Sequence, residues 1–345
     1  MDVEYEFRSN FNEKHNLITR KIIRMLSVNA RVGIAEMSKE LGISRTTVKK
    51  KFNRISSELG INYTLELDEK KLGLVSPHLI AIKFQKRPNY DKIRELLVKS
   101  YIPQVALITK GHYNMVIYAN SFSSSDYAHW DKSMRILLDD YDAVWLPSEV
   151  VHRQLGFFPL RNELIERSPI AEKHKPLLKA LNSNSRLSFQ QLSKTLKMHF
   201  NTVKYNFDRL VKEGIIKRPT ITLRIQKDMC FMSFFSNYTP KNGYEDSSAR
   251  ARLAFTSDDQ NPLISRYLIC APLIGANDFF TLGAFDNETV AFRNDIMYHK
   301  SVFKKHGIKI QYAEVERTLI GSLPIRSVDT KSEYNKITWM PDFKQ

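Results

Sequence analysis

The chain has 345 residues, of which 42% are hydrophobic and 11% aromatic, so it can form the cores of roughly two to four domains and does not resemble a disordered protein. Its 53 Lys and Arg residues exceed its 37 Asp and Glu residues, and the formal net charge of +16 favours a polyanionic partner. There is no apolar run of about 18 residues and no signal peptide at the polar start MDVEYEFRSN, so we expect a soluble cytoplasmic protein with no membrane partner. The two cysteines, Cys230 and Cys270, cannot form a disulfide framework or a zinc motif, and we expect both to be buried in strands.

Three helices are predicted near the start of the chain. Residues 17–28 carry apolar side chains at helical spacing, residues 34–41 form a short second helix, and Gly42 suits the positive φ that often follows a helix. Ser44 is a good N-cap for a third helix, in which Val48, Phe52 and Ile55 share the inward face. Two helices, a tight turn and a basic helix are typical of a helix-turn-helix.

The outward face of the third helix is strongly basic. The stretch SRTTVKKKFNRISSELG, residues 44–60, has no acid before Glu58. Long cationic side chains can reach phosphates and base edges in a major groove of double-stranded DNA. A merely solvated face is the alternative, but such faces usually mix charges of both signs. The predicted DNA-binding residues of this helix are Arg45, Thr46, Thr47, Lys49, Lys50, Asn53 and Arg54.

The helix-turn-helix pattern occurs twice. Residues 184–213 repeat residues 29–58 without a gap at a shift of 155, with identities that include Arg31/Arg186, Lys49/Lys204 and Phe52/Phe207. The second unit is predicted to contain helices at 172–181, 189–196 and 201–213, a wing at 214–218 and a strand at 220–225. Its outward face is milder, so we expect the first helix to be the stronger DNA reader. The predicted DNA-binding residues here are Asn201, Thr202, Lys204 and Tyr205.

The remaining segments indicate two ferredoxin-like domains and an α+β fold. Strands are predicted at 78–84, 105–110, 113–119 and 143–151, with one helix at 91–100 and another that contains Trp130 and Met134. A second copy fits strands at 229–236, 265–273, 279–285 and 308–319, a helix at 288–306 and an insertion loop at 237–261. Linkers are expected at 68–73 and 166–169. The predicted domains are 1–74 and 161–227 (winged helix-turn-helix), 75–160 and 228–328 (ferredoxin-like), and a tail at 329–345.

The segment NARVGIAEMSKELGISRTTVKKKFNRI, followed by LDEKKLGL and GHYN, resembles the Lrp/AsnC family of prokaryotic transcriptional regulators. The resemblance covers most of the chain as two tandem copies. It implies that the winged helix-turn-helix binds DNA, and that the ferredoxin-like domain self-associates and often binds an amino acid at the subunit interface. The family's G-x-Y-D turn matches residues 111–114 and, loosely, 275–278, where Asn114 replaces the acid and Asn277 the aromatic residue. The effector-binding residues implied are Gly111, Tyr113, Asn114, Gly275 and Asp278; alternatively, these are only turns between strands.

An enzyme is the alternative to a regulator. Siroheme decarboxylase subunits resemble the same family, and His112, His152 and Arg153 would be the candidate catalytic residues here. Their spacing predicts no catalytic arrangement, and a decarboxylase has no need of the basic face of the third helix. The motifs GxSxG, HExxH and GxGxxG after a strand do not occur, so hydrolase, metalloprotease and nucleotide-dependent activities have no support. We therefore expect a protein that is not an enzyme and uses no cofactor.

The sequence leaves open whether the two ferredoxin-like domains pair within one chain or between chains. Ferredoxin-like domains expose a sheet face that needs cover, so we expect a homo-oligomer formed through these domains. The two predicted DNA-reading helices carry different outward residues, so we also expect the half-sites they read to differ.

Overall fold

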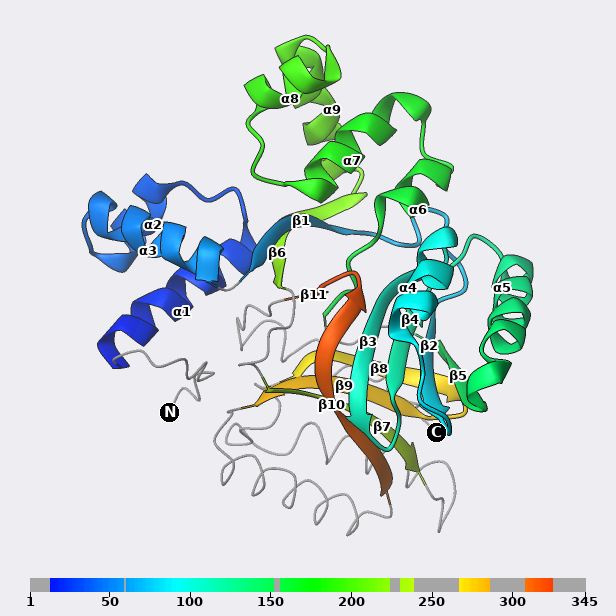
Figure 1. Ribbon diagram of the computed structural model, residues 1–345. Helices are drawn as coiled ribbons and strands as arrows, with labels where there is room; N and C mark the ends of the chain where they lie inside the picture. Colours follow the sequence, from blue (N-terminus) through cyan, green and yellow to red (C-terminus); the bar gives the residue numbers. More distant parts are fainter. Residues whose placement is uncertain are drawn as a thin grey trace, which may run out of the picture.

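The computed structural model of the protein describes residues 13–58, 60–151, 156–223, 230–238, 267–285 and 308–324. Two helical units, which we call head 1 (residues 13–67) and head 2 (residues 162–223), lie beside a body of strands (Figure 1). Head 1 contains α1 (Glu13–Val28), α2 (Ile34–Leu41), α3 (Arg45–Glu58) and β1 (Ile61–Leu67). Head 2 contains α6 (Asn162–Arg167), η2 (Glu172–His174), α7 (Lys175–Ser183), α8 (Phe189–Leu196), α9 (Phe200–Lys212) and β6 (Ile216–Leu223).

The turn that joins α2 to α3 forms as the sequence predicts. Gly42 ends α2 with φ of 64°, and its N–H donates to the carbonyl oxygen of Ser38. The Ser44 hydroxyl accepts a hydrogen bond from the N–H of Thr47 at 3.1 Å and so caps α3. Val48 is fully buried and Ile55 is 3% exposed, because the apolar stripe of α3 packs on the other helices of head 1. In head 2, Lys197 takes the place of Gly42, with φ of 52°.

The wing of head 2 differs from the prediction. A separate wing at 214–218 and a strand at 220–225 were expected, but a single strand, β6, runs over Ile216–Leu223. It pairs antiparallel with β1 along the whole of that strand, with Thr64 opposite Thr220. The short β11 (Leu323–Pro324) pairs with the other edge of β6. The predicted linker at 166–169 also begins inside a helix, α6.

The body consists of two four-stranded antiparallel sheets, each with the strand order of a ferredoxin-like domain. The first contains β2 (His78–Phe84), β3 (Pro103–Gly111), β4 (Met115–Ala119) and β5 (Ala143–Val150), and the second β7 (Cys230–Tyr238), β8 (Tyr267–Gly275), β9 (Phe279–Phe285) and β10 (Ile308–Ile320). The first copy also contains α4 (Tyr90–Lys99), α5 (Ser124–Leu137) and η1 (Asp139–Tyr141). The predicted helix at 288–306 and most of the predicted insertion loop lie outside the described residues.

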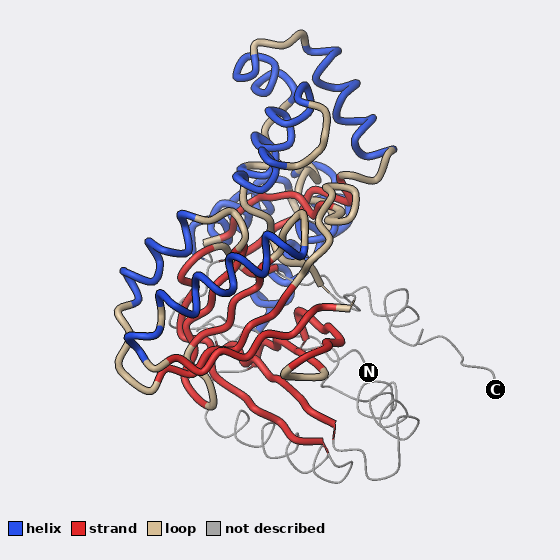
Figure 2. Tube along the Cα trace, turned by 90° about the vertical axis from the view of Figure 1, so that its right-hand side faces the viewer, coloured by secondary structure: helices blue, strands red, loops and turns tan. Residues whose placement is uncertain are grey.

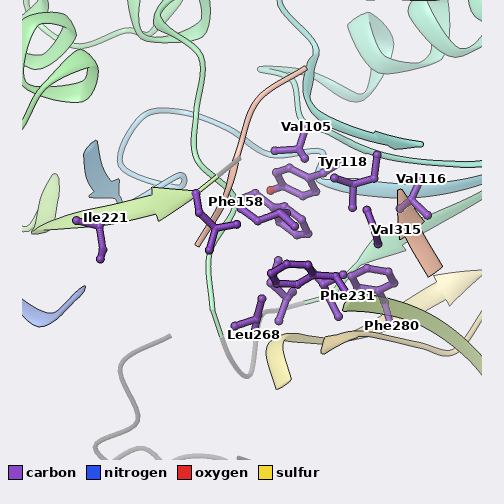
Figure 3. Close-up of a cluster of buried hydrophobic side chains, with 14 of the residues drawn as sticks. Val105, Val116, Tyr118, Phe158, Ile221, Phe231, Leu268, Phe280 and Val315 are labelled. Carbon is purple, nitrogen blue, oxygen red and sulfur yellow. The ribbon is translucent and has the colours of Figure 1, made fainter. Parts of the chain in front are cut away.

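The two sheets face each other and share one core. The pairs β3–β10 and β5–β8 join their edges, so that the eight strands close into a ring. Figure 2 shows the strands gathered in the body in red and the helices in blue. In β2, Leu79 and Ala81 face the second sheet, whereas Ile80 and Ile82 belong to the cluster formed with α4 and α5. Figure 3 shows the cluster between the sheets, which includes Tyr118, Phe158, Phe231, Phe280 and Val315. Burial on both faces explains why these strands read as continuous apolar runs.

This arrangement removes the physical basis on which self-association was expected. An uncovered sheet face was expected to pair with a second chain, but the two sheets of one chain cover each other. A homo-oligomer through these faces therefore lacks the surface on which it was predicted. Cys270, in β8, is buried as predicted, and the side chain of Cys230 lies outside the described residues. None of the described helices has the length and apolar character that a membrane crossing requires.

Candidate nucleic-acid interface

Helix α3 presents its predicted DNA-binding residues to solvent. Arg45, Thr46, Thr47, Lys49, Lys50, Asn53 and Arg54 are all exposed. The Thr47 hydroxyl lies 2.9 Å from that of Ser44, so one of its hydrogen bonds is used in the helix cap. Thr46 makes no such contact with the described residues, and its hydroxyl is the better placed of the two for an external partner.

Three cations of α3 have no charge partner in the part of the chain that the structure describes. Within the described part of the chain, no carboxylate forms an ion pair with Arg45, Lys49 or Lys50. Partial burial and the neighbouring charge of Arg54 both lower the pKa of Lys51, which is expected where like charges gather. A cationic surface without internal counter-ions attracts phosphates.

Helix α9 presents a different surface. Asn201, Thr202, Lys204 and Tyr205 are exposed, and Phe200 at the start of the helix is 39% exposed. Near the other end, Arg209 forms an ion pair with Glu213 at 2.6 Å, so that charge is balanced within the helix. The buried face of α9 is formed by Val203, Asn206 and Leu210.

The two heads are joined by a reciprocal pair of arginines. Arg31 of head 1 donates to the carbonyl oxygens of Ser185 at 2.7 Å and Leu187 at 2.9 Å. Its guanidinium lies over the rings of Phe189 and Phe207, at 4.7 and 5.4 Å from their centroids. Burial lowers the pKa of Arg31, and the charge of Arg186 lowers it further.

Arg186 of head 2 makes the matching contacts in head 1. It donates to the carbonyl oxygens of Ala30 at 2.5 Å and Val32 at 3.3 Å, and lies over the rings of Phe52 and Tyr63. A groove of about 510 Å³ opens beside this contact, against the second half of α3. Each head thus holds an arginine of the other head against the aromatic residues of its own fold.

The β1–β6 ribbon adds a second connection with the same two-fold character. Thr64 and Thr220 face each other in the ladder. The Thr64 hydroxyl donates to the carbonyl oxygen of Asn182 in α7, and the Thr220 hydroxyl donates to that of Ser27 in α1. α3 and α9 lie on opposite sides of this ribbon (Figure 1). One chain therefore holds α3 and α9 in a relative position that internal contacts set.

The first predicted effector turn is occupied by protein contacts. The Tyr113 hydroxyl donates to the carbonyl oxygen of Ser233 in β7 at 2.6 Å, and burial raises the pKa of this tyrosine. The Asn114 side chain accepts a hydrogen bond from the N–H of Phe84 at 2.9 Å. Gly111 has φ of 150°, and a Cβ there would lie 2.6 Å from the carbonyl oxygen of Tyr312. These contacts explain the turn as a junction between the sheets, and an effector at this position stays a prediction.

The second turn forms the matching junction on the other side of the body. A Cβ on Gly275 would lie 2.8 Å from the carbonyl oxygen of Pro147 in β5. The N–H of Asp278 donates to the carbonyl oxygen of Ser236. Asn277, which stands where the first turn has Tyr113, is 2% exposed, and its Nδ2 has no hydrogen-bond partner among the described residues. The two junctions therefore differ in the polar group that they enclose.

Comparisons with known proteins agree with the geometry of the heads. The family model described as winged helix-turn-helix DNA-binding matches residues 15–54 and 171–217, one stretch in each head. An uncharacterised HTH-type transcriptional regulator of Pyrococcus abyssi (strain GE5 / Orsay) is 31% identical over 129 residues, which are 75% of that protein and 37% of this chain. The regulatory protein AsnC of Haemophilus influenzae is 29% identical over 106 residues, which are 71% of that protein and 30% of this chain. The chain belongs to the Lrp/AsnC family of transcriptional regulators.

This Lrp/AsnC-type chain is about twice as long as those relatives, and a solved structure has a similar fold over most of its length. The crystal structure of the siroheme decarboxylase NirDL covers 93% of this chain, and this chain covers 98% of it, with a TM-score of 0.55 and 12% identity. At that identity the similarity establishes the fold alone. The doubled fold of this regulator is thus shared with an enzyme.

The enzyme alternative named His112, His152 and Arg153, and the structure describes only the first of them. The Nδ1 of His112 lies 2.9 Å from the carbonyl oxygen of Tyr312, whereas His152 and Arg153 lie outside the described residues. Within the described ranges, no three His, Cys, Asp or Glu side chains are grouped so that they could hold a metal ion. Sequence analysis did not assign a role to Arg31 and Arg186. It showed that the two arginines occupy equivalent positions of the repeat, but not that each contacts the opposite head.

Proposed function

We propose that the protein binds double-stranded DNA and regulates transcription, with α3 inserted in a major groove. The exposed basic face of α3, on which Arg45, Lys49 and Lys50 have no internal ion pair among the described residues, carries this proposal. Phosphate contacts position such a helix, and contacts to base edges select the sequence. Family membership supports the same function.

The salt dependence of binding tests the role of α3. The double variant Lys49→Glu, Lys50→Glu should bind all DNA sequences more weakly, because it removes cations that neutralise phosphates. For each phosphate that the variant no longer neutralises, the slope of log affinity against log salt concentration should fall by about 0.9. Fluorescence anisotropy with a labelled duplex over a series of salt concentrations measures both quantities.

The double variant Lys99→Glu, Lys132→Glu is the matched control. It makes the same change in net charge at exposed positions of α4 and α5, outside α3 and α9. Its salt slope should stay close to that of the unchanged protein. Equal slopes for the two double variants would show that α3 is not the DNA-binding surface.

One chain should engage DNA as a two-headed unit. The reciprocal arginines and the β1–β6 ribbon support this, because they join α3 and α9 without a second chain. If both helices contact one face of the duplex, their half-sites should lie about 10 base pairs or a multiple apart. A hydroxyl-radical footprint on a selected site measures that spacing.

A tetrapyrrole enzyme is the second candidate, because the fold similarity to the siroheme decarboxylase extends over 93% of this chain. NirDL has been crystallised with an iron-uroporphyrin III analogue. Titration of the protein with iron-uroporphyrin III, followed by the absorbance of the tetrapyrrole, tests this candidate. A saturable spectral change at one ligand per chain would favour it, and an unchanged spectrum would argue against it.

A further inference from the structure

The two recognition helices begin at equivalent positions but carry different chemistry. At the shift of 155 that relates the repeats, Arg45 corresponds to Phe200, Thr46 to Asn201 and Lys50 to Tyr205, whereas Lys49 and Lys204 agree. Two cations of α3 are therefore replaced by aromatic side chains on α9. The buried positions are alike in kind, with Val48 matched by Val203 and Ile55 by Leu210.

The aromatic side chains of α9 are not required for the core of head 2. Phe200 is 39% exposed and Tyr205 is 64% exposed, while Leu192, Val203 and Leu210 fill the core and are fully buried. The ring of Phe200 meets that of Phe189 edge to face, with centroids 6.2 Å apart, which restrains its direction. Both rings are therefore available for contact with a partner.

The charge around α9 indicates that this partner is still DNA. Lys204 lies on the same outward face, and Lys194 and Lys197 are exposed in and directly after the preceding helix. Glu213 is already paired with Arg209, which leaves Asp208 as the exposed acid of the helix without an ion pair in the described part of the chain. A surface with apolar rings between cations suits a groove that offers both phosphates and methyl groups.

The major groove presents one apolar group, the C5-methyl of thymine, and phenylalanine is among the side chains that contact it. Asparagine pairs with the N6 and N7 of adenine, whereas arginine and lysine favour the O6 and N7 of guanine. We infer that α9 reads A·T pairs, with Phe200 and Tyr205 against thymine methyl groups and Asn201 against adenine, whereas Arg45 and Lys50 of α3 read G·C pairs. This inference rests on the proposed DNA-binding function and specifies its target: an operator with one G·C half-site and one A·T half-site.

Replacement of thymine by deoxyuridine tests the inference, because it removes the methyl group alone and leaves the protein unchanged. The full-length protein is first used to select its site from random duplexes, and deoxyuridine is then placed in each half-site in turn. In the half-site read by α9, each contacted methyl should be worth about fourfold in affinity, the factor equivalent to ~0.8 kcal/mol for a buried apolar carbon. In the other half-site, the same replacement should leave affinity within twofold.

Protein variants assign the effect to α9. Phe200→Ala should weaken binding to the thymine duplex and should abolish the difference between thymine and deoxyuridine at the position that Phe200 contacts, while the contact of Tyr205 remains. Tyr205→Phe should keep the difference, because the ring remains, and Tyr205→Ala should reduce it. Ile136→Ala, which removes a 66% exposed apolar side chain from α5, is the matched control and should change neither affinity.

Two results would overturn the inference, and they are distinguishable. Site-specific binding that is indifferent to deoxyuridine in both half-sites would leave the proposed function intact and would show that the aromatic face of α9 serves another partner, such as a protein. Absence of any site-specific DNA binding by the full-length protein would overturn both the inference and the proposed function.

Discussion

Arg31 and Arg186 place two positive charges in the interface between the heads, and carbonyl oxygens and aromatic rings of the opposite head stabilise each of them. Each guanidinium donates to two carbonyl oxygens and stacks on two aromatic rings of the opposite head. A lysine at either position could supply the charge but not the flat, forked donor that these contacts use. Both residues were visible in the sequence as part of the repeat, but repetition alone does not say whether an arginine faces solvent or a second head.

Arg31→Lys should therefore destabilise the protein almost as much as Arg31→Ala, by about 2 kcal/mol, the range for hydrogen bonds from a charged donor. Thermal unfolding of both variants measures the loss. Arg24→Ala, at an exposed position in α1 of the same head, serves for comparison and should have a smaller effect. A lysine variant as stable as the unchanged protein would show that charge, and not the forked geometry, matters at this interface.

At the first junction, the backbone of the opposite sheet lies close to Gly111. Gly111→Ala should cost about 1–3 kcal/mol, because its Cβ would lie 2.6 Å from a carbonyl oxygen and φ is 150°. Gly33→Ala is the comparison: no atom lies within 4 Å of a Cβ placed there, so the change should cost only the exchange of glycine for alanine at the N-cap of α2, about 0.5–1 kcal/mol. Denaturation in urea gives both values, and equal stabilities would contradict the close approach.

At the scale of elements, most of the described helices could be predicted, except α6, and the strand partners could not be predicted. The bounds of α2 and α8 agree with the prediction because apolar spacing and the residues at their ends are local signals. β1 was missed, and β6 was divided into a wing and a strand, because the partner of each lies about 150 residues away in the other repeat. The outward residues of α3 and α9 followed from periodicity alone, but the DNA bases they contact depend on a docking that no local pattern encodes.

The β1–β6 ribbon contains an ion pair between the two heads, and its two charges can be exchanged by mutation. Glu66 accepts from Nε of Arg218 at 2.7 Å. Glu66→Arg should destabilise the protein by about 1 kcal/mol, because it places two cations side by side and the pair is partly screened by solvent. The double variant Glu66→Arg, Arg218→Glu should recover most of that loss. A double-mutant cycle from urea denaturation measures the coupling, and a double variant no more stable than Glu66→Arg would contradict a direct interaction.

At the scale of the whole molecule, the main feature is the closed ring of eight strands. Because the two sheets of one chain pack face to face, a single chain forms the hydrophobic core between them. Its core comes from both repeats, as the contact of Tyr113 with Phe235 illustrates, with ring centroids 5.2 Å apart. The two repeats should therefore unfold together and not in sequence.

A single unfolding step and a one-to-one complex follow from this arrangement. Thermal unfolding should give the same midpoint by far-ultraviolet circular dichroism, which reports the whole chain, and by tryptophan fluorescence, which reports Trp130 and Trp145 of the first repeat together with Trp339. Light scattering of the protein with its selected duplex should give one chain for each duplex at the lowest concentration that saturates binding. Separate midpoints would show that the repeats are independent, and two chains per duplex would show that the two heads of one chain do not suffice for a site.

Because the architecture is duplicated within one chain, a single substitution changes one helix-turn-helix unit and leaves the other unchanged. In a symmetric dimer of identical chains, every substitution enters both halves, so a new base preference must be accepted by both half-sites together. Here Arg45 and Phe200 are encoded separately, and either can change while the other keeps its target. Arg31 and Arg186 do not have this freedom, because each depends on carbonyl groups and rings of the opposite head. Mutational drift should therefore diversify the faces of α3 and α9 while the contact between the heads holds both at a constant separation.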